Sequence, residues 1–495
     1  MPVNSPSKIY LEKKPQWDTV RDCVEGQINI KNGGTKYLPR PAGHTDEDYE
    51  NYKKRAVFFD GTSRTAEGLH GHIFAKDPVQ VGAEKISDAF KERLKNVDAS
   101  GTSLDEFVSN ITWDAMQAPW GGILADHTPV EPGTSLADDK GFAYLKWYSA
   151  ESVYSWRYSV IGGAKKLSKV VLREDTEEEK PDDEFETVTK ETYRVLSLEL
   201  YEKGYRYSQR VFTKDDKAKG GFVQNESVYP TIDGKYLDFI PFYNCPGEIP
   251  EKSMLLGLSF ENIGHYQKTA DYENGLHYTG VPTPIAENME TPMNVTKDAT
   301  TGKEIKTPKK MSLGGSQFLF FCQKDKDGKI ADVRVKFLEF SGAGLGQLLS
   351  ALNGCLDRMA KLGIMAIGSE KKGVETAEVA QIHRASEHGV LGAFCRSMSD
   401  KITQAVRLMA IWNGIQEDEA NNWAYELPTK FNLEEMSAQI LAIMHSARQS
   451  GEIPRSVWFT TLKKAGYIPE NMTYETFLKE LDDYIGGHGP DGDEE

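Results

Sequence analysis

Residues 345–362 have the sequence LGQLLSALNGCLDRMAKL, which contains the clearest secondary-structure signal in the chain. Leucine and methionine recur there every three or four residues, with polar residues such as Gln347, Asn353 and Asp357 between them. That spacing places the apolar side chains on one face of an α-helix. The stretch therefore predicts an amphipathic helix that packs along one side against another part of the protein.

One more helix is expected before this one and another after it. The period is helical over 259–279, and the glycines and prolines of 280–284 end it. Polar and aromatic residues are mixed around most of its circumference, which is typical of a helix that bridges elements or packs against other chains. After an interruption at 363–373, the pattern over 375–412 predicts a helix about 55 Å long.

The N-terminal half predicts helices followed by strands. Residues 1–45 are rich in proline, glycine and charge, so an irregular arm is expected there. Helices are expected at about 46–59, 65–74 and 103–116. After Gly141, aromatic and β-branched residues predict strands at 142–160, 169–173, 192–200, 205–212, 222–229 and 236–243.

An acidic run of nine carboxylates lies between Glu174 and Glu186. It fits a solvated loop between two strands, and the alternative is a site for a cation or a basic partner. Further along the chain, strands are expected at 317–322 and 332–340. A small helical unit is expected at 433–449, 455–465 and 474–485, each helix ending at a glycine, before a disordered acidic tail.

Composition excludes several classes of protein. A length of 495 residues corresponds to about three domains, and the net charge of −16 argues against a surface that is basic throughout and binds nucleic acid. A secretory signal and an apolar run of about 18 residues are both missing, so neither secretion nor a membrane span is expected. The five cysteines form no C-x-x-C pair, which favours a reducing cytosol over a disulfide framework or a zinc site.

Motifs for catalysis or cofactor binding are weak. The Walker A pattern GxxxxGK[ST] is absent, and so is the Gly-x-Ser-x-Gly elbow of hydrolases. His383 and His388 are five residues apart, so they point in different directions on a helix, and His70, His72 and Asp77 form only a weak metal candidate. No catalytic residue, metal or cofactor is therefore expected, and the chain is not expected to be an enzyme.

One alternative remains open at this point. The segment Gly342–Gly346 follows an expected strand and precedes a helix, which is the order of a nucleotide-binding loop. Its spacing departs from G-x-G-x-x-G, because position 347 is glutamine. The alternative is a nucleotide-binding enzyme that uses this loop.

Two basic clusters lie in expected loops. Lys303, Lys306, Lys309 and Lys310 belong to the segment between the first two long helices, and Lys371 with Lys372 lies between the second and third. In a single chain each cluster fits a solvated loop. In a ring of identical subunits each lysine would instead become a belt of positive charge.

The order of these parts resembles that of tailed-bacteriophage portal proteins, in particular a branch catalogued as a portal-like domain of unknown function. The resemblance covers about 46–485. It rests on the segments Tyr52–Phe58, Thr65–Gly71, Ile240–Phe242, Asn262–Tyr266, Gly275–Pro284, Met359–Gly363 and Glu375–Ala377.

The resemblance implies an α+β portal fold and a division of the chain. The parts are an N-terminal arm (1–45), a wing in two segments (46–252 and 376–428), two stem helices (253–279 and 344–364), a clip (280–343), a tunnel loop (365–375), a helical crown (429–486) and an acidic tail (487–495).

The resemblance also implies partners and sites. Portal subunits form a ring, usually of twelve, at one capsid vertex, and double-stranded DNA passes through it. The partners would be the terminase large subunit, a head-completion adaptor, and the major capsid and scaffolding proteins, with no membrane involved. The alternative within this class is a phage structural protein that forms oligomers without conducting DNA.

Individual residues receive roles from the same resemblance. The tunnel loop would line the DNA channel with Ser369, Glu370, Lys371, Lys372 and Gly373, and the clip would present the four lysines Lys303, Lys306, Lys309 and Lys310. Packing between subunits in the stem would use Tyr266, Tyr272, Leu348, Leu352 and Met359.

Overall fold

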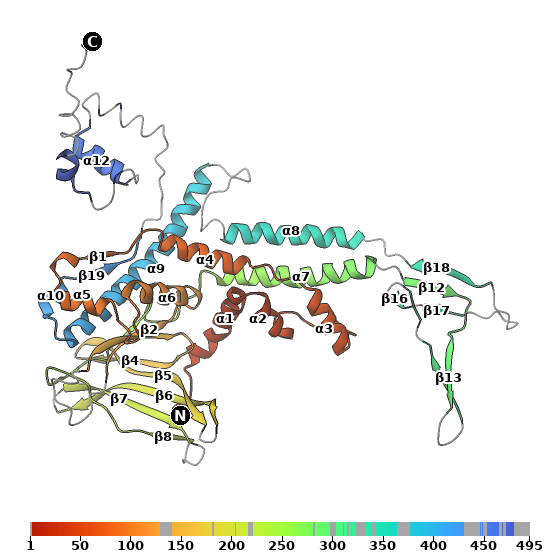
Figure 1. Ribbon diagram of the computed structural model, residues 1–495, viewed down its shortest axis with the longest axis horizontal. Coiled ribbons are helices and arrows are strands. Elements are labelled where there is room, and N and C mark those ends of the chain that lie inside the picture. Colours follow the sequence, from red (N-terminus) through yellow and green to blue (C-terminus); the bar gives the residue numbers. More distant parts are fainter. Residues whose placement is uncertain are drawn as a thin grey trace, which may run out of the picture. The chain divides into compact units, whose positions relative to one another are not determined.

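The computed structural model describes residues 2–128, 141–180, 183–202, 204–215, 221–280, 283–297, 303–309, 311–313, 316–317, 319–322, 332–338, 343–363, 377–429, 446, 448, 453–464, 468 and 472–479. The chain divides into two units, Met1–Thr429 and Lys430–Glu495. The fold is mixed α and β, with helices and mainly antiparallel sheets, the described exception being the parallel pair of β12 with β17 (Figure 1).

The described helices lie mainly before and after the large sheets. They are α1 (Lys8–Glu25), α2 (Gln27–Asn32), η1 (Gly34–Lys36), α3 (Asp46–Arg55), α4 (Gly61–Ile73), η2 (Ala83–Lys85), α5 (Asp88–Leu94), α6 (Leu104–Gln117), α7 (Leu256–Gly280), α8 (Ala343–Gly363), α9 (Ala377–Trp412), α10 (Glu417–Asn421) and α12 (Arg455–Lys464).

The described strands form several sheets. Those of the two larger sheets are β2 (Gly121–His127), β3 (Ala143–Ser149), β4 (Val153–Ile161), β5 (Ala164–Lys180), β6 (Asp183–Tyr201), β7 (Gly204–Lys214), β8 (Phe222–Gln224) and β11 (Phe242–Asn244). The shorter strands are β1 (Val79–Val81), β9 (Thr231–Ile232), β10 (Lys235–Tyr236), β12 (Thr283–Glu287), β13 (Met293–Lys297), β14 (Glu304–Pro308), β15 (Ser312–Leu313), β16 (Ser316–Gln317), β17 (Leu319–Phe321), β18 (Arg334–Leu338) and β19 (Ala424–Glu426).

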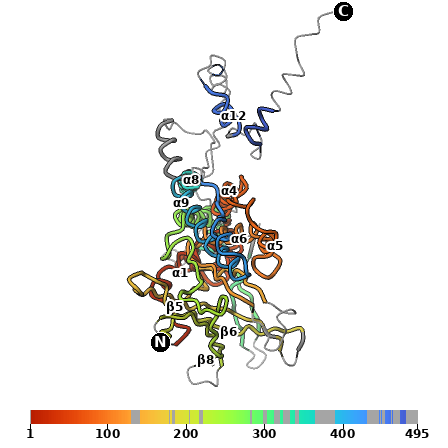
Figure 2. The backbone as a smooth tube through the Cα atoms, turned by 90° about the vertical axis from the view of Figure 1, so that its left-hand side faces the viewer, coloured from red at the N-terminus to blue at the C-terminus, as the bar shows by residue number. Residues whose placement is uncertain are grey.

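Two antiparallel sheets and a layer of helices make up most of the first unit. One sheet has the order β11-β2-β3 and the other β4-β5-β6-β7-β8. Helix α9 packs against β2, β3, β11 and β19, and Figures 1 and 2 show it with α4 and α6 on the same side of the five-stranded sheet. The helix expected over 375–412 is confirmed as α9, and its apolar residues Met398, Ile402, Ala405 and Met409 are all buried.

The N-terminal segment differs from its prediction. An irregular arm was expected over 1–45, but α1 and α2 occupy most of it. The Ser7 hydroxyl accepts a hydrogen bond from the Tyr10 backbone N–H, which caps α1. Tyr10, Trp17 and Val24 share the helical spacing of an apolar face and are buried. The prediction was wrong because proline, glycine and charge masked this spacing.

The acidic run also differs from its prediction. Strands β5 and β6 continue through it and pair from Lys169 with Ser197 as far as Lys180 with Asp183. The predicted loop is therefore a long β-hairpin.

The strand boundaries also differ from the prediction near Pro241. The strand expected at 236–243 is split into β10 and β11, and Pro241, which lacks an N–H donor, lies just before β11.

The second unit is described over a few segments. Helix α12 places Phe459 against Tyr474 and Phe477, with ring centroids 5.4 and 5.0 Å apart. The expected helix at 474–485 is seen over 474–479. Most of the helix expected at 433–449 and all of the acidic tail lie outside the described residues.

Candidate functional site

The most distinctive arrangement in the first unit is the pairing of α7 with α8, which confirms both expected helices. The Arg358 guanidinium joins them by donating from Nε to Glu261 Oε1 at 2.9 Å. The helices also approach closely at Gly275, where a Cβ atom would come 2.6 Å from Leu345 Cδ2. Figure 1 shows the pair leading from the helical layer to the short strands β12–β18.

Helix α7 is also anchored in the core of its own chain. Tyr266 and Ala270 are buried with residues from α1, α2 and α3, among them Cys23, Ile30 and Tyr52. The Tyr52 hydroxyl donates to Asp271 Oδ1 at 2.6 Å. The mixed polar character of α7 is therefore explained in part by packing within one chain.

This packing corrects part of the stem prediction. Tyr266, Leu352 and Met359 are 0, 6 and 4% exposed in the isolated chain. They were expected to pack between subunits, but the α7–α8 contact and the adjoining core already bury them. Tyr272 and Leu348 are only half-buried, so they keep surface that a neighbouring molecule could contact.

Large apolar side chains nevertheless remain exposed on the helix pair. Their exposed fractions lie between 40 and 57%, and they are Phe260, Leu276, Tyr278, Leu349 and Leu362. Exposed apolar residues that lie together often form a surface that binds another macromolecule, whereas a single exposed apolar residue is common on any protein.

The predicted clip lysines lie on or beside one hairpin. Lys306 is in β14, opposite Val295 of β13, and Lys303 and Lys309 flank the strand. All three are exposed, and none forms an ion pair with another described residue. Lys310 lies outside the described residues. The structure thus brings three of the four lysines together on one two-stranded ribbon.

The predicted tunnel-loop residues Ser369, Glu370, Lys371, Lys372 and Gly373 lie outside the described residues. The glycine-rich alternative can be placed in part. Gly344 and Gly346 lie inside α8, and β18 pairs antiparallel with β12. A dinucleotide loop instead follows a strand of a parallel βαβ unit.

The histidine candidates do not form a metal site in the described part of the chain. His70 Nε2 lies 3.1 Å from the Ser109 carbonyl oxygen, and its ring packs at a tilt against Phe74 and edge to face with Trp113. Across the described residues, no three His, Cys, Asp or Glu side chains come together to hold a metal ion. His383 and His388 lie in α9, where their side chains are not described.

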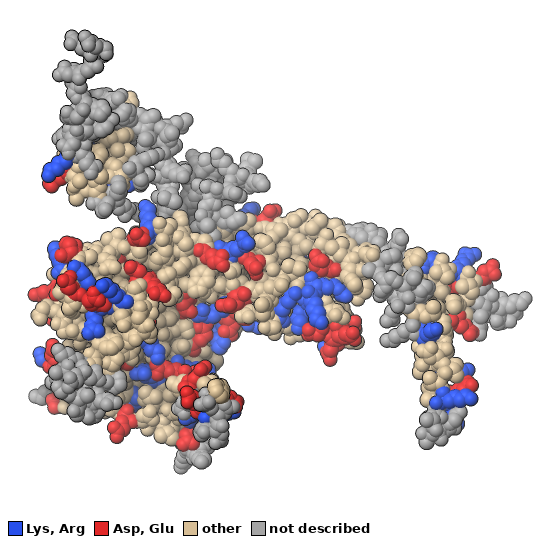
Figure 3. Space-filling view, in the orientation of Figure 1, with Lys and Arg blue, Asp and Glu red and all other residues tan. Residues whose placement is uncertain are grey.

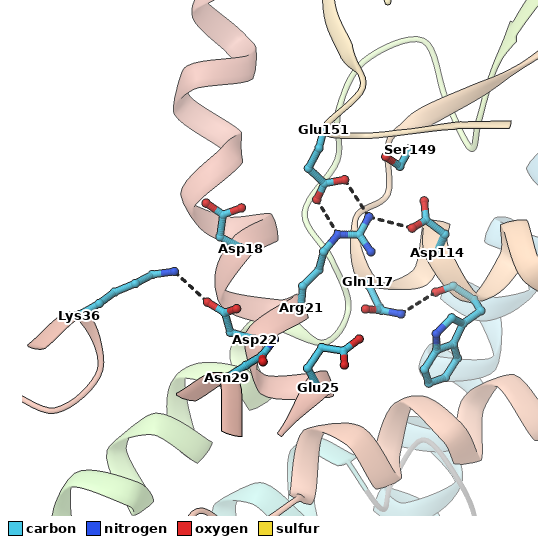
Figure 4. A pocket seen from close by; sticks show the side chains of 11 residues that line it. Asp18, Arg21, Asp22, Glu25, Asn29, Lys36, Asp114, Gln117, Ser149 and Glu151 are labelled. Atoms are coloured by element: carbon cyan, nitrogen blue, oxygen red, sulfur yellow. Dashed lines mark hydrogen bonds and ion pairs between the residues drawn. The ribbon is translucent and has the colours of Figure 1, made fainter. Parts of the chain in front are cut away.

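A polar hollow of about 680 Å³ opens between α1, α6 and the β3–β4 turn, and the sequence did not predict it (Figure 4). Arg21 reaches across it, with Nε 2.5 Å from Glu151 Oε1 and Nη2 2.8 Å from Asp114 Oδ1. Burial raises the pKa of the Asp114 carboxyl, although the Arg21 charge opposes that shift. Among the residues that line the hollow, carboxylates outnumber cations, so the hollow suits a cationic group.

Sequence reasoning missed this hollow because α1 was taken as an irregular arm. The helical spacing of Asp18, Asp22 and Glu25 was the available signal. Arg21 is a clamp that ties α1 to α6 and to the β3–β4 turn, since both of its carboxylate partners come from other elements.

One family model matches the part of the chain that contains the paired helices. Residues 254–413 match the family model described as a domain of unknown function, DUF4055. The match spans α7, the strands β12–β18, α8 and the whole of α9. No curated protein matches the chain.

Among solved structures, one chain titled "Virion of native gene transfer agent (GTA) particle" is similar to this one, with a TM-score of 0.31 and 11% sequence identity. The alignment covers 86% of this chain and 94% of that chain. A TM-score this low establishes neither a shared fold nor a shared function. Within the described residues, no helix has the length and apolar character needed to cross a membrane.

Proposed function

We propose that this chain is a phage portal subunit, which forms a ring-shaped DNA channel at one capsid vertex for genome packaging, retention and ejection. The observation that carries the proposal is the α7–α8 pair, which leaves Phe260, Leu349 and Leu362 exposed. Further copies of the same pair in a ring would cover these side chains. The DUF4055 match supports the proposal because it includes the segments Gly275–Pro284 and Met359–Gly363, on which the resemblance rests.

The dimensions of helices permit such a ring. Twelve helices side by side at 8–10 Å spacing form a circle about 31–38 Å across at their axes. Subtracting one helix diameter of about 10 Å leaves a hole of about 20–28 Å. A DNA duplex fits within that width.

The charge of the chain suits passage of DNA. Duplex DNA carries a negative charge every ~1.7 Å, so a broadly basic channel would bind it and slow its movement. A chain with a net charge of −16 instead repels the duplex toward the axis. Weak contacts would then be confined to lysine belts, one of them at Lys371 and Lys372.

In this proposal the chain is not an enzyme and needs no cofactor. The terminase large subunit supplies ATP hydrolysis and docks at the clip, where Lys303, Lys306 and Lys309 are exposed. A head-completion adaptor then replaces it, and the capsid and scaffolding proteins surround the wing. The expected location is the virion.

Electron microscopy of the purified full-length chain tests the proposal. Rings with a central hole wide enough for duplex DNA are expected. Leu349→Glu with Leu362→Glu should abolish them, whereas the matched control Gln347→Glu on the same helix should not. A monomer, or an oligomer without a hole, would contradict the proposal.

A further inference from the structure

One face of the five-stranded sheet carries a row of positive side chains on neighbouring strands. Arg157 of β4 lies directly opposite Lys169 of β5, and Lys169 lies opposite Ser197 of β6. From β7, the Arg210 guanidinium donates to Ser197 Oγ at 2.9 Å. Because residues directly opposite share a face, Arg157, Lys169 and Arg210 form one cationic row.

The cationic row lacks counter-charges within the described part of its own chain. None of its three residues forms an ion pair there, and Arg210 Nε is buried without a hydrogen-bond partner. The acid two residues beyond Ser197, Glu199, accepts from Ser208 Oγ at 2.7 Å and lies 3.8 Å from Arg206. Like charges directly opposite each other destabilise a sheet.

The pKa of Lys169 reflects this crowding. Burial lowers it, and the neighbouring charges of Arg210 and Arg157 lower it further. An anionic group placed on the row would relieve the repulsion.

The opposite pattern occurs further along the same face. Strands β5 and β6 extend beyond β4 and β7 as a two-stranded hairpin, where Asp175 lies directly opposite Glu191. Glu177 and Glu179 follow at two-residue steps, so they point to the same face as Lys169. These four carboxylates, Asp175, Glu177, Glu179 and Glu191, are called the acidic ribbon here.

The acidic ribbon is also short of counter-charges. Arg173 pairs with Asp175 at 2.9 Å and Lys214 approaches Glu191 at 3.9 Å. In the described part of the chain, Glu177 and Glu179 have no cationic partner and are exposed. A two-stranded ribbon is only marginally stable alone, and opposed like charges weaken it further.

The two patches cannot neutralise each other within one chain. Lys169 and Asp175 are separated along the extended strand β5 by about 20 Å, at ~3.3 Å per residue. That separation exceeds twice the Debye length of about 8 Å at physiological salt. Each patch therefore keeps its excess charge in an isolated subunit.

We propose that the acidic ribbon of one copy of this chain docks on the cationic row of a second copy. Because the row and the ribbon lie on the same face, two copies placed face to face pair both ways at once, which is a self-complementary two-fold contact. The inference goes beyond the proposed function, because a ring does not by itself require this contact. The opposite charges of the two patches favour a second copy over a nucleic acid, whose phosphates the acidic ribbon would repel.

Charge reversal tests the contact. The row variant carries Arg157→Glu and Lys169→Glu, and the ribbon variant carries Glu177→Lys and Glu179→Lys. The control reverses Lys165 and Lys166, which lie on the same strand but already pair with Glu248 and Asp238. Assembly of the full chain is followed by sedimentation velocity, with circular dichroism as a check on folding.

Each reversal should raise the protein concentration for half-assembly about tenfold, since several surface pairs become repulsive. An equimolar mixture of the two variants should assemble like the wild type, and so should one chain carrying all four substitutions. The rescue separates pairing from misfolding, because a misfolded variant would not recover.

Three results would overturn the inference. The first is that the charge-reversed variants assemble like the wild type. The second is that neither the mixture nor the combined chain recovers assembly. The third is that the row variant loses binding to a DNA duplex while its assembly is unchanged. If wild-type rings persist in these cases, the proposed function survives. If the wild-type chain itself remains a monomer, the proposed function fails together with this contact.

Discussion

Arg194 lies between the buried carboxylate of Asp126 and the half-buried one of Glu174, with Nε 3.0 Å from Glu174 Oε2 and Nη1 3.2 Å from Asp126 Oδ2. Glu174 comes from β5 and Asp126 from β2, so one guanidinium joins the two larger sheets. Burial acts to raise the pKa of Glu174, but Arg194 and Lys146 outweigh it and the pKa is lowered.

Arg194→Met should therefore strongly destabilise the protein. Glu174 keeps Lys146 as a partner, but the buried carboxylate of Asp126 loses the cation that it has among the described residues. Leaving a buried charge uncompensated costs about 3–5 kcal/mol. Urea denaturation at pH 7 measures the loss. The control Arg40→Met breaks an exposed pair with Asp46 and should change the free energy of unfolding by less than about 1 kcal/mol. Equal effects of the two substitutions would contradict the role given to Arg194.

Two tyrosines on neighbouring elements should respond in opposite ways to loss of the hydroxyl. The Tyr266 hydroxyl is buried and has no hydrogen-bond partner among the described residues, whereas the Tyr52 hydroxyl donates to Asp271. Tyr266→Phe should be neutral or stabilising by about 1 kcal/mol, and Tyr52→Phe should cost about 1–3 kcal/mol. Chemical denaturation of both variants checks the difference, and a larger loss for Tyr266→Phe would disprove it.

Glycines in α8 offer a matched pair of substitutions. A Cβ atom at Gly363 would lie 2.5 Å from Thr65 Oγ1, while one at Gly354 meets only the end of Arg358 at 3.6 Å. Gly354→Ala should stabilise the helix by about 0.5–1 kcal/mol. Gly363→Ala should instead lower the melting temperature, because Thr65 is buried and branched. Similar stabilisation by both substitutions would show that α4 and α8 do not pack as described.

His265 should make stability depend on pH. Burial lowers its pKa below the ordinary value, and the Lys268 charge contributes to the same shift. The unfolded chain then binds more protons than the folded one just below that ordinary value, so stability falls as pH decreases from about 7 toward 5. In His265→Asn the slope of the free energy of unfolding against pH over this range should be smaller. An unchanged slope would assign the pH dependence to other groups.

The sequence predicted α8 and α9 because their apolar residues recur at a local spacing that few other structures share. Leu352, Met359 and Met398 are buried as that spacing requires. The sequence did not predict which surface each apolar residue would contact. Tyr266 was expected to pack against a neighbouring subunit, but it packs within its own chain. Local spacing defines a helix face, whereas the partner of that face is decided by the whole fold.

The candidate hollow and the ion-pair networks were harder to predict for the same reason. Arg21 meets Glu151 across 130 residues, and Arg194 meets Asp126 across 68. Charges are so frequent in this chain that no pair stands out in the sequence. The long β5–β6 hairpin was missed because consecutive acids resemble a loop, although the strands on either side were predicted.

The tunnel-loop lysines make the last prediction, which concerns DNA passage. If the chain forms the proposed channel, Lys371 and Lys372 of every subunit provide the positive charge nearest the duplex at its constriction. Lys371→Glu with Lys372→Glu turns that belt into a repulsive one, because DNA phosphates line the opposing surface. We expect virions with shorter packaged DNA and slower packaging, while ring assembly itself is unchanged. Lys371→Arg with Lys372→Arg preserves the charge and should behave like the wild type. DNA length per virion and packaging rate are the measurements. If the reversed variant packages the full genome at the normal rate, these two lysines do not act on the duplex.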